Sequence, residues 1–356
     1  MTFLYILAAI LLFGVLITVH EAGHFFAARA LGIPVREFAI GFGPKLYKWK
    51  RKKHETEFFL RAIPLGGYCA FYGEDDTTGE FKDDPRLFSK YPVWKRLLTI
   101  LMGPVMNLVL AFLVAALLFS LSGVPVGSGP FSTTVQSVSD GGAAQAAGLL
   151  PGDVILRVDG QPVTDNLSEI VGRQPGGVSR RFQVQRVVDG QPATLELDVI
   201  PAYDPGEGRN MIGIVMSVSQ PVTLVRGSPG DILRHAYNLS YQAGSMVFRA
   251  IRDLFTRGEG LGEVSGVVGI TKMIVDEISR TQWEGYLYLM VIISINLGLM
   301  NLLIIPGLDG SRILFLIVEA IRGKPIEKEG YVHAAGMVLL FGLMIAITFR
   351  DILRLF

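Results

Sequence analysis

Four long apolar segments constrain the fold of this chain more than any other feature of its sequence. They cover residues 3–30, 97–121, 286–305 and 332–349, and a helix needs about 20 apolar residues to cross a hydrocarbon core roughly 30 Å thick. The first segment has no basic residue before its apolar run, so we expect a retained span rather than a signal peptide. Because 50% of the residues are hydrophobic and only 18% are charged, the composition predicts a polytopic α-helical membrane protein with about four transmembrane helices.

The basic residues indicate how these segments are oriented. Positions 29–96 contain 14 Lys and Arg residues, and the loop after the third segment adds Arg312, Arg322, Lys324 and Lys328. Since cytoplasmic loops carry an excess of positive charge, both loops should face the cytoplasm, and the region 123–285 should be extracytoplasmic. The net charge of +1, without an extended basic stripe, gives no reason to expect a nucleic acid partner.

The first apolar segment contains the pentapeptide His20-Glu21-Ala22-Gly23-His24. Two imidazoles four residues apart project from one helix face and can hold one zinc ion, while the glutamate between them can accept a proton from water. Ionisable groups at bilayer depth cost about 2.5 to 3.5 kcal/mol each, which argues against a purely structural role. The alternatives are packed or capping histidines, and helix packing through Ala22 and Gly23. The pentapeptide therefore predicts a hydrolytic metal centre within the membrane.

A catalytic zinc normally has three protein ligands, and a chain with only one cysteine cannot build the site from thiolates. The best-placed carboxylate is Asp309, at the cytoplasmic end of the third apolar segment. Pro306 and Gly307 break the helix before it, and Gly310 permits a turn, so Asp309 can be directed back toward the metal. The alternative is that Asp309 caps a following helix that opens at Ser311.

Two asparagines lie upstream in the same apolar segment and need polar partners at that depth. Asn301 can donate to a developing oxyanion or hold a substrate carbonyl. The alternative for both is hydrogen bonding between helices, which is our preferred interpretation of Asn296.

Three motifs that are far apart in the chain carry a specific resemblance. They are HEAGH in the first apolar segment, Gly103-Pro-Val-Met-Asn107 in the second, and the run from Asn301 to Gly310. Together they resemble the site-2 protease family of intramembrane zinc metalloproteases, over nearly the whole chain. The resemblance implies His20, His24 and Asp309 as ligands of Zn2+, Glu21 as the general base, and Asn301 as a contact of the substrate or the transition state. Ile304 stands where the family usually has proline.

Residues 40–73 mix strand-forming residues with turn signals, which predicts a β-hairpin that dips to the membrane surface. In the family, a membrane-associated β-loop here is thought to pair with an unwound substrate segment, since strand addition replaces the hydrogen bonds of the lost helix. The alternative is a cytoplasmic hairpin without substrate contact. We take Gly66, Gly67 and, from the second motif, Asn107 as candidate substrate-binding residues.

The central region predicts a small β-rich domain, because short alternating apolar segments follow a Gly/Pro/Ser-rich boundary. Residues 146–160 resemble part of a PDZ domain of the bacterial protease type, in a single copy. The expected parts are an N-terminal membrane part (1–122), a PDZ-like domain (123–204), a linker with an amphipathic helix (205–285) and a C-terminal membrane part (286–356). The groove of such a domain can bind an extended peptide, act as a size filter, or serve as a structural cap. The helix, over 231–255, can lie in the membrane interface or pack on the β-rich domain.

The resemblance implies an intramembrane zinc endopeptidase that acts in or near the transmembrane segment of a previously trimmed single-pass protein, such as an anti-sigma factor or a remnant signal peptide. Its partners would be transmembrane substrates, membrane lipid and a peptide ligand of the PDZ-like domain. Its place would be the bacterial inner membrane, with the active site toward the cytoplasm. Two alternatives are a catalytically silent scaffold and a metal transporter. The intact Glu21 argues against the scaffold, and a single compact ligand set argues against the transporter.

Overall fold

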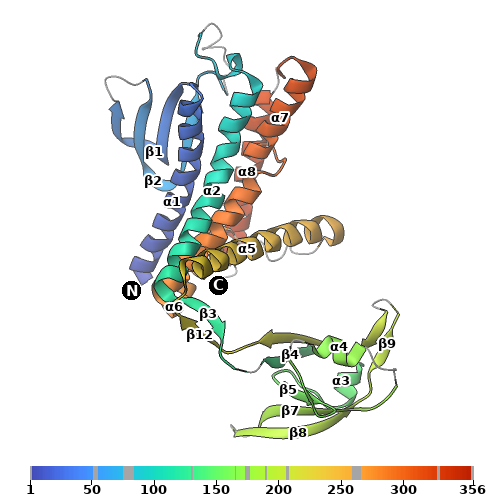
Figure 1. Cartoon of the computed structure of the whole chain (residues 1–356). Helices are drawn as coiled ribbons and strands as arrows, with labels where there is room; N and C mark the ends of the chain where they lie inside the picture. The colour runs from blue at the N-terminus through green and yellow to red at the C-terminus, as the bar shows by residue number, and fades with distance from the viewer. Residues whose placement is uncertain are drawn as a thin grey trace. The chain divides into compact units, whose positions relative to one another are not determined.

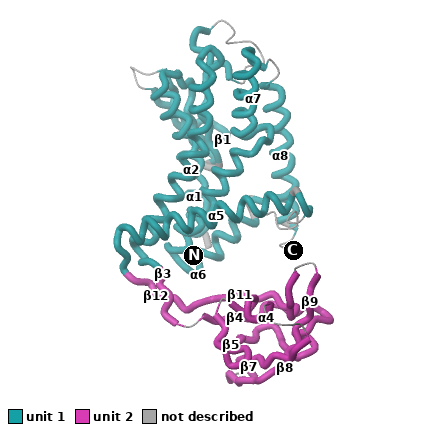
Figure 2. Tube along the Cα trace, turned by 45° about the vertical axis from the view of Figure 1, so that its right-hand side comes forward, with its two compact units in different colours: residues 1–124, 226–356 teal, residues 125–225 magenta. Residues whose placement is uncertain are grey.

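The computed structural model describes most of the chain as two compact units. The described residues are 2–50, 55–74, 84–129, 131–164, 166–172, 177–188, 191–205, 208–258, 266–326 and 329–353. The helical unit comprises Met1–Val124 and Arg226–Phe356, and the β-rich unit comprises Pro125–Val225 (Figure 2). Each unit is described by itself.

Six α-helices and a short 3-10 helix build the described part of the helical unit. They are α1 (Thr2–Ala30), η1 (Phe88–Lys90), α2 (Val93–Ser122), α5 (Pro229–Arg257), α6 (Val267–Asn301), α7 (Asp309–Arg322) and α8 (Glu329–Leu353). Among these, α1, α2, α6 and α8 are long and apolar enough to cross a membrane, which confirms the four predicted spans. The start of α1 and the end of α8 lie at the same end of this unit (Figure 1), as four successive crossings between them require.

Small residues allow the membrane helices to pack closely. Ala111 and Ala115 of α2 are fully buried against Leu12 of α1 and Val291 of α6. Within a bilayer, helices associate by van der Waals packing, and small residues bring their backbones together. On α8, by contrast, large apolar side chains such as Leu339 are 71% exposed, which suits a surface that faces lipid.

Helix α6 is longer than the predicted third span, and it is kinked. It starts at Val267 instead of near residue 286, and Gln282 interrupts it with non-helical angles (φ 56°, ψ −131°). Its first amide groups are held by Asp351 near the end of α8, whose carboxylate accepts a hydrogen bond from the Gly266 N–H at 2.7 Å. A carboxylate at a helix N-terminus is favourable because it meets the positive end of the helix dipole.

Strands β1 (Val35–Lys50) and β2 (Glu57–Phe71) form the predicted hairpin. Residues 35–40 of β1 pair antiparallel with 67–71 of β2, and residues 45–50 pair antiparallel with 57–61; residues 38–40 also lie beside 58–60, so the sheet is more than a simple two-stranded hairpin. The sheet lies along α1 (Figure 1). The first half of β1 is largely buried, and Phe38 packs with Phe25 of α1 and with Phe71 in one apolar cluster. This cluster attaches the hairpin to the helix that carries the two histidines.

The β-rich unit contains one larger sheet and two small strand pairs. Its strands are β3 (Val124–Gly127), β4 (Ser132–Val138), β5 (Val154–Val158), β6 (Gln161–Pro162), β7 (Arg180–Val188), β8 (Gln191–Val199), β9 (Ala202–Asp204), β10 (Arg209–Met211), β11 (Ile214–Ser219) and β12 (Val222–Val225). The sheet order is β11-β4-β5-β7-β8, with β6 beside β5; β9 pairs with β10 and β3 with β12. Helices α3 (Ala143–Ala146) and α4 (Leu167–Gly172) complete the unit.

The core of this unit consists of inward-facing strand residues, among them Val135, Ile155, Phe182 and Val184, all almost fully buried. The alternation of apolar and polar residues along each strand produces this one-sided burial. The predicted β-rich insertion is therefore confirmed. The unit runs to Val225, beyond the expected boundary at residue 204, because β11 returns to pair with β4.

Helix α5 is the predicted amphipathic helix. Ser228 and Asp231 form a capping box at its start, which satisfies free backbone N–H groups. It belongs to the helical unit, where it lies across the other helices (Figure 1) and packs against α2 and α6. Ala236 and Ala243 are its buried contacts, while Tyr237 is 60% exposed. Tyrosine, exposed on the outer face of α5, is a residue type enriched at membrane–water interfaces.

Candidate metal centre

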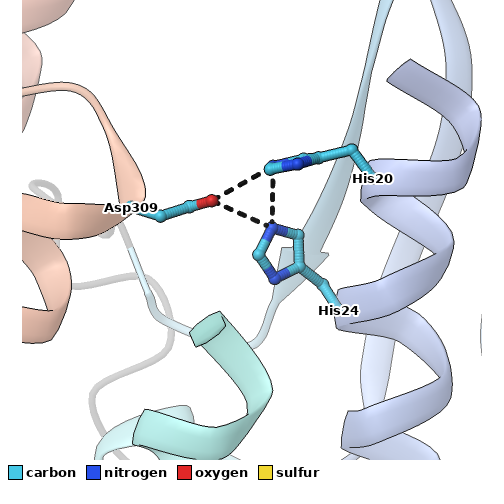
Figure 3. A group of neighbouring side chains, drawn as sticks. All are labelled: His20, His24 and Asp309. Atoms are coloured by element: carbon cyan, nitrogen blue, oxygen red, sulfur yellow. Dashed lines mark hydrogen bonds and ion pairs between the residues drawn. The ribbon is translucent and has the colours of Figure 1, made fainter. Parts of the chain in front are cut away.

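Three side chains from opposite ends of the sequence meet at one point (Figure 3). His20 and His24 lie one turn apart on α1 and project from the same helix face, and Asp309 reaches them from the first residue of α7. Its Oδ2 atom is 3.1 Å from His20 Nε2 and 3.4 Å from His24 Nε2, and the two nitrogens are 3.2 Å apart. Both histidines are buried. The structure thus brings together the three residues that we predicted as ligands.

The donor atoms of this triangle fit a zinc ion. The Nδ1–H of His24 donates to the Thr99 backbone carbonyl at 2.9 Å, so Nε2 of the neutral ring carries the lone pair. Apart from the two imidazole nitrogens, the buried Asp309 Oδ2 has no polar partner among the described residues. Ligand atoms at about 2.0–2.2 Å from zinc, arranged tetrahedrally, lie roughly 3.3–3.6 Å apart, close to the observed separations. Three electron-rich atoms that converge in a buried place are favourable ligands for a shared cation.

The turn over residues 302–308 directs Asp309 at the histidines. Gly307 has a φ of 98°, which side chains rarely tolerate. Gly310 approaches the Leu302 carbonyl so closely that a Cβ atom there would overlap it. Helix α7 begins at Asp309 without a side-chain cap. The capping role that we considered for Asp309 is therefore not what the structure contains.

A cavity of about 600 Å³ lies beside His20, His24 and Asp309. Glu21 lines it from α1, and Cys69 of β2 lines the same cavity. Asn301, the last residue of α6, lines the same cavity. A carboxylate that can accept a proton and an amide that can donate a hydrogen bond therefore share one chamber with the ligand triangle.

The β-hairpin reaches this chamber through the two glycines of β2. Gly66 and Gly67 both line the cavity. A Cβ atom at Gly67 would lie 3.4 Å from Cγ of Glu21 and only 2.8 Å from the Ala39 carbonyl oxygen of β1. A side chain at position 67 would therefore push the strand away, so glycine keeps the β2 backbone next to Glu21.

The remaining asparagines are placed differently from one another. Asn107 is fully buried in α2, and its Nδ2 atom is 3.1 Å from Nδ1 of His20, while it does not belong to the described lining of the cavity. Asn296, for which we preferred a hydrogen bond between helices, is exposed on α6.

Several functional contacts carry no signal in the sequence. Thr99 acts through its backbone carbonyl, which every residue type possesses. Arg312 of α7 forms an ion pair with Glu74, and both side chains line the cavity; this pairing bridges regions far apart in the chain. The cavity also includes Cys69, and desolvation raises the pKa of its thiol well above the usual value, with the negative charges of Glu21 and Glu74 adding to the shift.

Comparisons with known proteins agree with this geometry. The model of peptidase family M50 matches residues 8–344. Zinc metalloprotease RasP of Geobacillus kaustophilus is 30% identical over 99% of this chain and 98% of its own length. Zinc metalloprotease RasP of Oceanobacillus iheyensis and the regulator of sigma-W protease RasP of Bacillus subtilis are each 29% identical over 99% of both chains.

These matches cover both units of the chain, including the helices that carry the ligand triangle. They support the protease interpretation, and they do not support the silent scaffold or the metal transporter. The four candidate spans place the protein in a membrane as a multi-pass protein. The chain belongs to peptidase family M50, the site-2 protease family, and is a membrane zinc metalloprotease.

Proposed function

We propose that this protease cleaves a peptide bond in or near a transmembrane segment, with His20, His24 and Asp309 holding Zn2+ and Glu21 acting as the general base. One observation carries the proposal. Three buried ligand atoms lie 3.1–3.4 Å apart beside Glu21 and a cavity of about 600 Å³. A proton acceptor next to a metal site, in a chamber of this size, is the arrangement that peptide hydrolysis needs.

Each residue of the chamber has a defined task in this proposal. Zinc held by His20, His24 and Asp309 would polarise the scissile carbonyl and lower the pKa of the attacking water. Glu21 accepts the proton of that water and later delivers it to the leaving amine. Asn301 donates a hydrogen bond to the developing oxyanion from the end of α6. The position of Asn301 on the cavity wall supports this task.

The β2 strand supplies the surface on which the substrate is held. A transmembrane helix must unwind before its peptide bonds can be attacked, and its backbone then needs new hydrogen-bond partners. Gly66 and Gly67 bring the β2 backbone to the cavity wall beside Glu21. An extended substrate segment that adds to the hairpin as a further strand would present its carbonyl groups to the metal centre.

The substrate class that fits best is a single-pass membrane protein already shortened outside the membrane, such as an anti-sigma factor or a remnant signal peptide. The similarity over 99% of both chains to a regulator of sigma-W protease supports this class. The β-rich unit, Pro125–Val225, acts as a PDZ-like domain that binds the new end of the trimmed substrate or excludes untrimmed proteins. Lipid is the second partner, in contact with apolar side chains such as Leu339.

The basic loops support an orientation in the bacterial inner membrane. The 14 Lys and Arg residues of positions 29–96 favour a cytoplasmic hairpin and an extracytoplasmic β-rich unit. Protease added to right-side-out vesicles should then cleave within residues 125–225 and leave the β1–β2 hairpin intact. Cleavage of the hairpin by the added protease would show that the protein has the opposite orientation.

Hydrolysis is tested with the full-length protein reconstituted with a single-pass substrate peptide. Glu21→Gln should keep its zinc, measured by metal analysis, and cleavage should fall by about 10²- to 10⁴-fold, the usual contribution of a general base. Asp276→Asn, which changes an exposed acid on α6, is the matched control and should cleave normally. Unimpaired cleavage by Glu21→Gln would disprove the role of the base.

A further inference from the structure

The two histidines each have a second ring nitrogen, and α2 contacts both of these nitrogens. Nδ1 of His24 is 2.9 Å from the Thr99 carbonyl oxygen, and Nδ1 of His20 is 3.1 Å from the Asn107 amide. Thr99 and Asn107 are fully buried. Helix α2 thus forms a layer behind the ligand triangle, although it supplies none of the three ligands.

Gly103 allows this layer to lie against the imidazoles. A Cβ atom at position 103 would overlap Cε1 and Nε2 of His24 and would lie 3.0 Å from Cε1 of His20. Any side chain here would displace both rings. The spacing of Thr99, Gly103 and Asn107 by four residues places all three on one face of α2, and that face meets the two rings.

The position of the hydrogen on the His20 ring determines whether Asn107 must accept or donate a hydrogen bond. If Nε2 of His20 holds zinc, its lone pair is used there, and the hydrogen of the neutral ring sits on Nδ1. The partner of Nδ1 must then be an acceptor. In Asn107 the oxygen Oδ1 is buried and has no hydrogen-bond partner among the described residues, and an unused buried acceptor is unfavourable.

Amide oxygen and nitrogen are assigned by their partners and can be exchanged by a half-turn of the amide group. With this half-turn, Oδ1 takes the place of Nδ2 beside His20 and accepts the Nδ1 hydrogen. The orientation of the Asn107 amide and the tautomer of His20 are therefore one linked choice, and only the orientation with Oδ1 toward the ring leaves the Nε2 lone pair free for the metal.

Contacts with α6 fix the position of Asn107. The Ser294 hydroxyl, itself fully buried, donates to the Asn107 backbone carbonyl at 2.8 Å. Gly298 lies one turn further along, where a Cβ atom would be 3.3 Å from Cβ of Asn107 and 3.0 Å from the Pro104 carbonyl oxygen. The close approach of α6 leaves Asn107 little freedom to move away from His20.

We propose that Asn107 is a positioning residue of the zinc centre, whose side-chain oxygen accepts the His20 Nδ1 hydrogen and so selects the tautomer and the ring orientation that bind zinc. This inference rests on the proposed ligand assignment, and it replaces substrate contact as the role of Asn107. Partners of metal-bound histidines are usually carboxylates, backbone carbonyls or water. A neutral amide does the same work without placing another negative charge beside Glu21 and Asp309.

The test is the zinc affinity of purified full-length protein in detergent, measured by competition with a chelator. Asn107→Leu has similar size but no acceptor, and zinc should bind about 10- to 100-fold more weakly, the usual effect of losing such a partner. Asn107→Asp keeps an acceptor at this position and should bind zinc more tightly than Asn107→Leu. Asn296→Leu makes the same chemical change at the exposed position of α6 and should leave zinc affinity unchanged.

Replacing zinc by cobalt adds a spectroscopic measurement. It reports a change at the metal that a general destabilisation of the fold would not produce. The visible spectrum of the cobalt protein should change in Asn107→Leu and return in Asn107→Asp. If Asn107→Leu does not fold, Asn107→Ala removes the same acceptor without a branched side chain and serves in its place. Unchanged zinc affinity in the folded variant would overturn the proposal and leave Asn107 a structural role. A raised KM together with unchanged zinc affinity would instead indicate a substrate-binding role.

Failure of the inference can be told apart from failure of the proposed function. The inference is read from metal affinity alone, so it stands even if the reconstituted protein cleaves no peptide. Conversely, if His20→Ala binds zinc as tightly as the original protein, the ligand assignment itself is wrong, and the role of Asn107 is refuted with it.

Discussion

Arg96 of α2 and Glu319 of α7 form a buried ion pair with two hydrogen bonds, of 2.9 and 2.5 Å. Their side chains are only 6% and 10% exposed. The pair joins the helix that backs the histidines to the helix that begins with Asp309. It therefore holds two parts of the candidate metal centre together from a distance.

Arg96→Ala should destabilise the protein by about 3 to 5 kcal/mol, because it leaves the Glu319 charge buried without a partner. The double variant Arg96→Met, Glu319→Leu should recover most of this loss, since apolar side chains of similar volume need no charge partner. Thermal unfolding in detergent measures both. Arg252→Ala, which removes an exposed partner of Asp253, should change stability by less than about 1 kcal/mol. Equal stability of Arg96→Ala and the original protein would mean that the pair contributes nothing.

Gly103→Ala should weaken zinc binding, because the added methyl group would overlap the His24 ring. Gly342→Ala is the matched control, since a Cβ atom at this glycine of α8 meets nothing within 4 Å. The control should be neutral or more stable by up to about 1 kcal/mol, as alanine favours helices more than glycine does. Zinc competition and thermal unfolding separate the two variants. If both substitutions behave alike, the space at Gly103 is not needed by the histidines.

Removal of zinc should abolish cleavage, and restoring zinc should return it. In Asp309→Asn the loss of a charged ligand should weaken zinc binding by more than the 10- to 100-fold that an outer partner contributes. Metal analysis after dialysis against a chelator gives the occupancy of each variant. Asp253→Asn, an acid on α5 away from the cavity lining, should retain zinc. Full occupancy in Asp309→Asn would remove this residue from the ligand set.

The Cys69 thiol should react slowly with alkylating reagents at pH 8. The thiolate is the reactive form, and an ordinary thiol has a pKa near 8.5; desolvation raises the pKa of Cys69, so less thiolate forms at a given pH. The alkylation rate of Cys69 should rise with pH, and this rise should occur at higher pH than it does for free cysteine. In zinc-free protein, Glu74→Gln should speed the reaction modestly and unfolding should speed it most, because desolvation is the larger cause. Alkylation as fast as in unfolded protein would contradict the raised pKa.

Much of the fold follows from local sequence. The apolar lengths predict the membrane helices because each must satisfy its own backbone within the bilayer. The start of α6 escaped prediction because residues 267–285 contain charges such as Lys272 and Asp276, which interrupt the apolar run but not the helix. The turn before Asp309 follows from Pro306 and Gly307, and it forms with Ile304 in place of the proline that the family usually has.

The remaining part of the fold depends on which helices and strands contact one another. The local sequence of each element does not contain that information. Helix α5 has the periodicity of an amphipathic helix, but its packing on α2 and α6 is settled by shape at Ala236 and Ala243. The same limit applies to the metal centre. The ligands have a recognisable chemistry and spacing, whereas the layer behind them uses the backbone of Thr99 and the missing side chain of Gly103, which become informative only once α2 is placed beside α1.

The distance in sequence between His20 and Asp309 has a consequence for how the protein is made. Both histidines lie on α1, whereas Asp309 follows α6, after the β-rich unit has been synthesised. The proposed ligand set is therefore incomplete until Asp309 has been added. A nascent chain that carries only α1 and α2 has the two imidazoles without the carboxylate of Asp309, so this protease would become competent only after α6 and the start of α7 have joined α1.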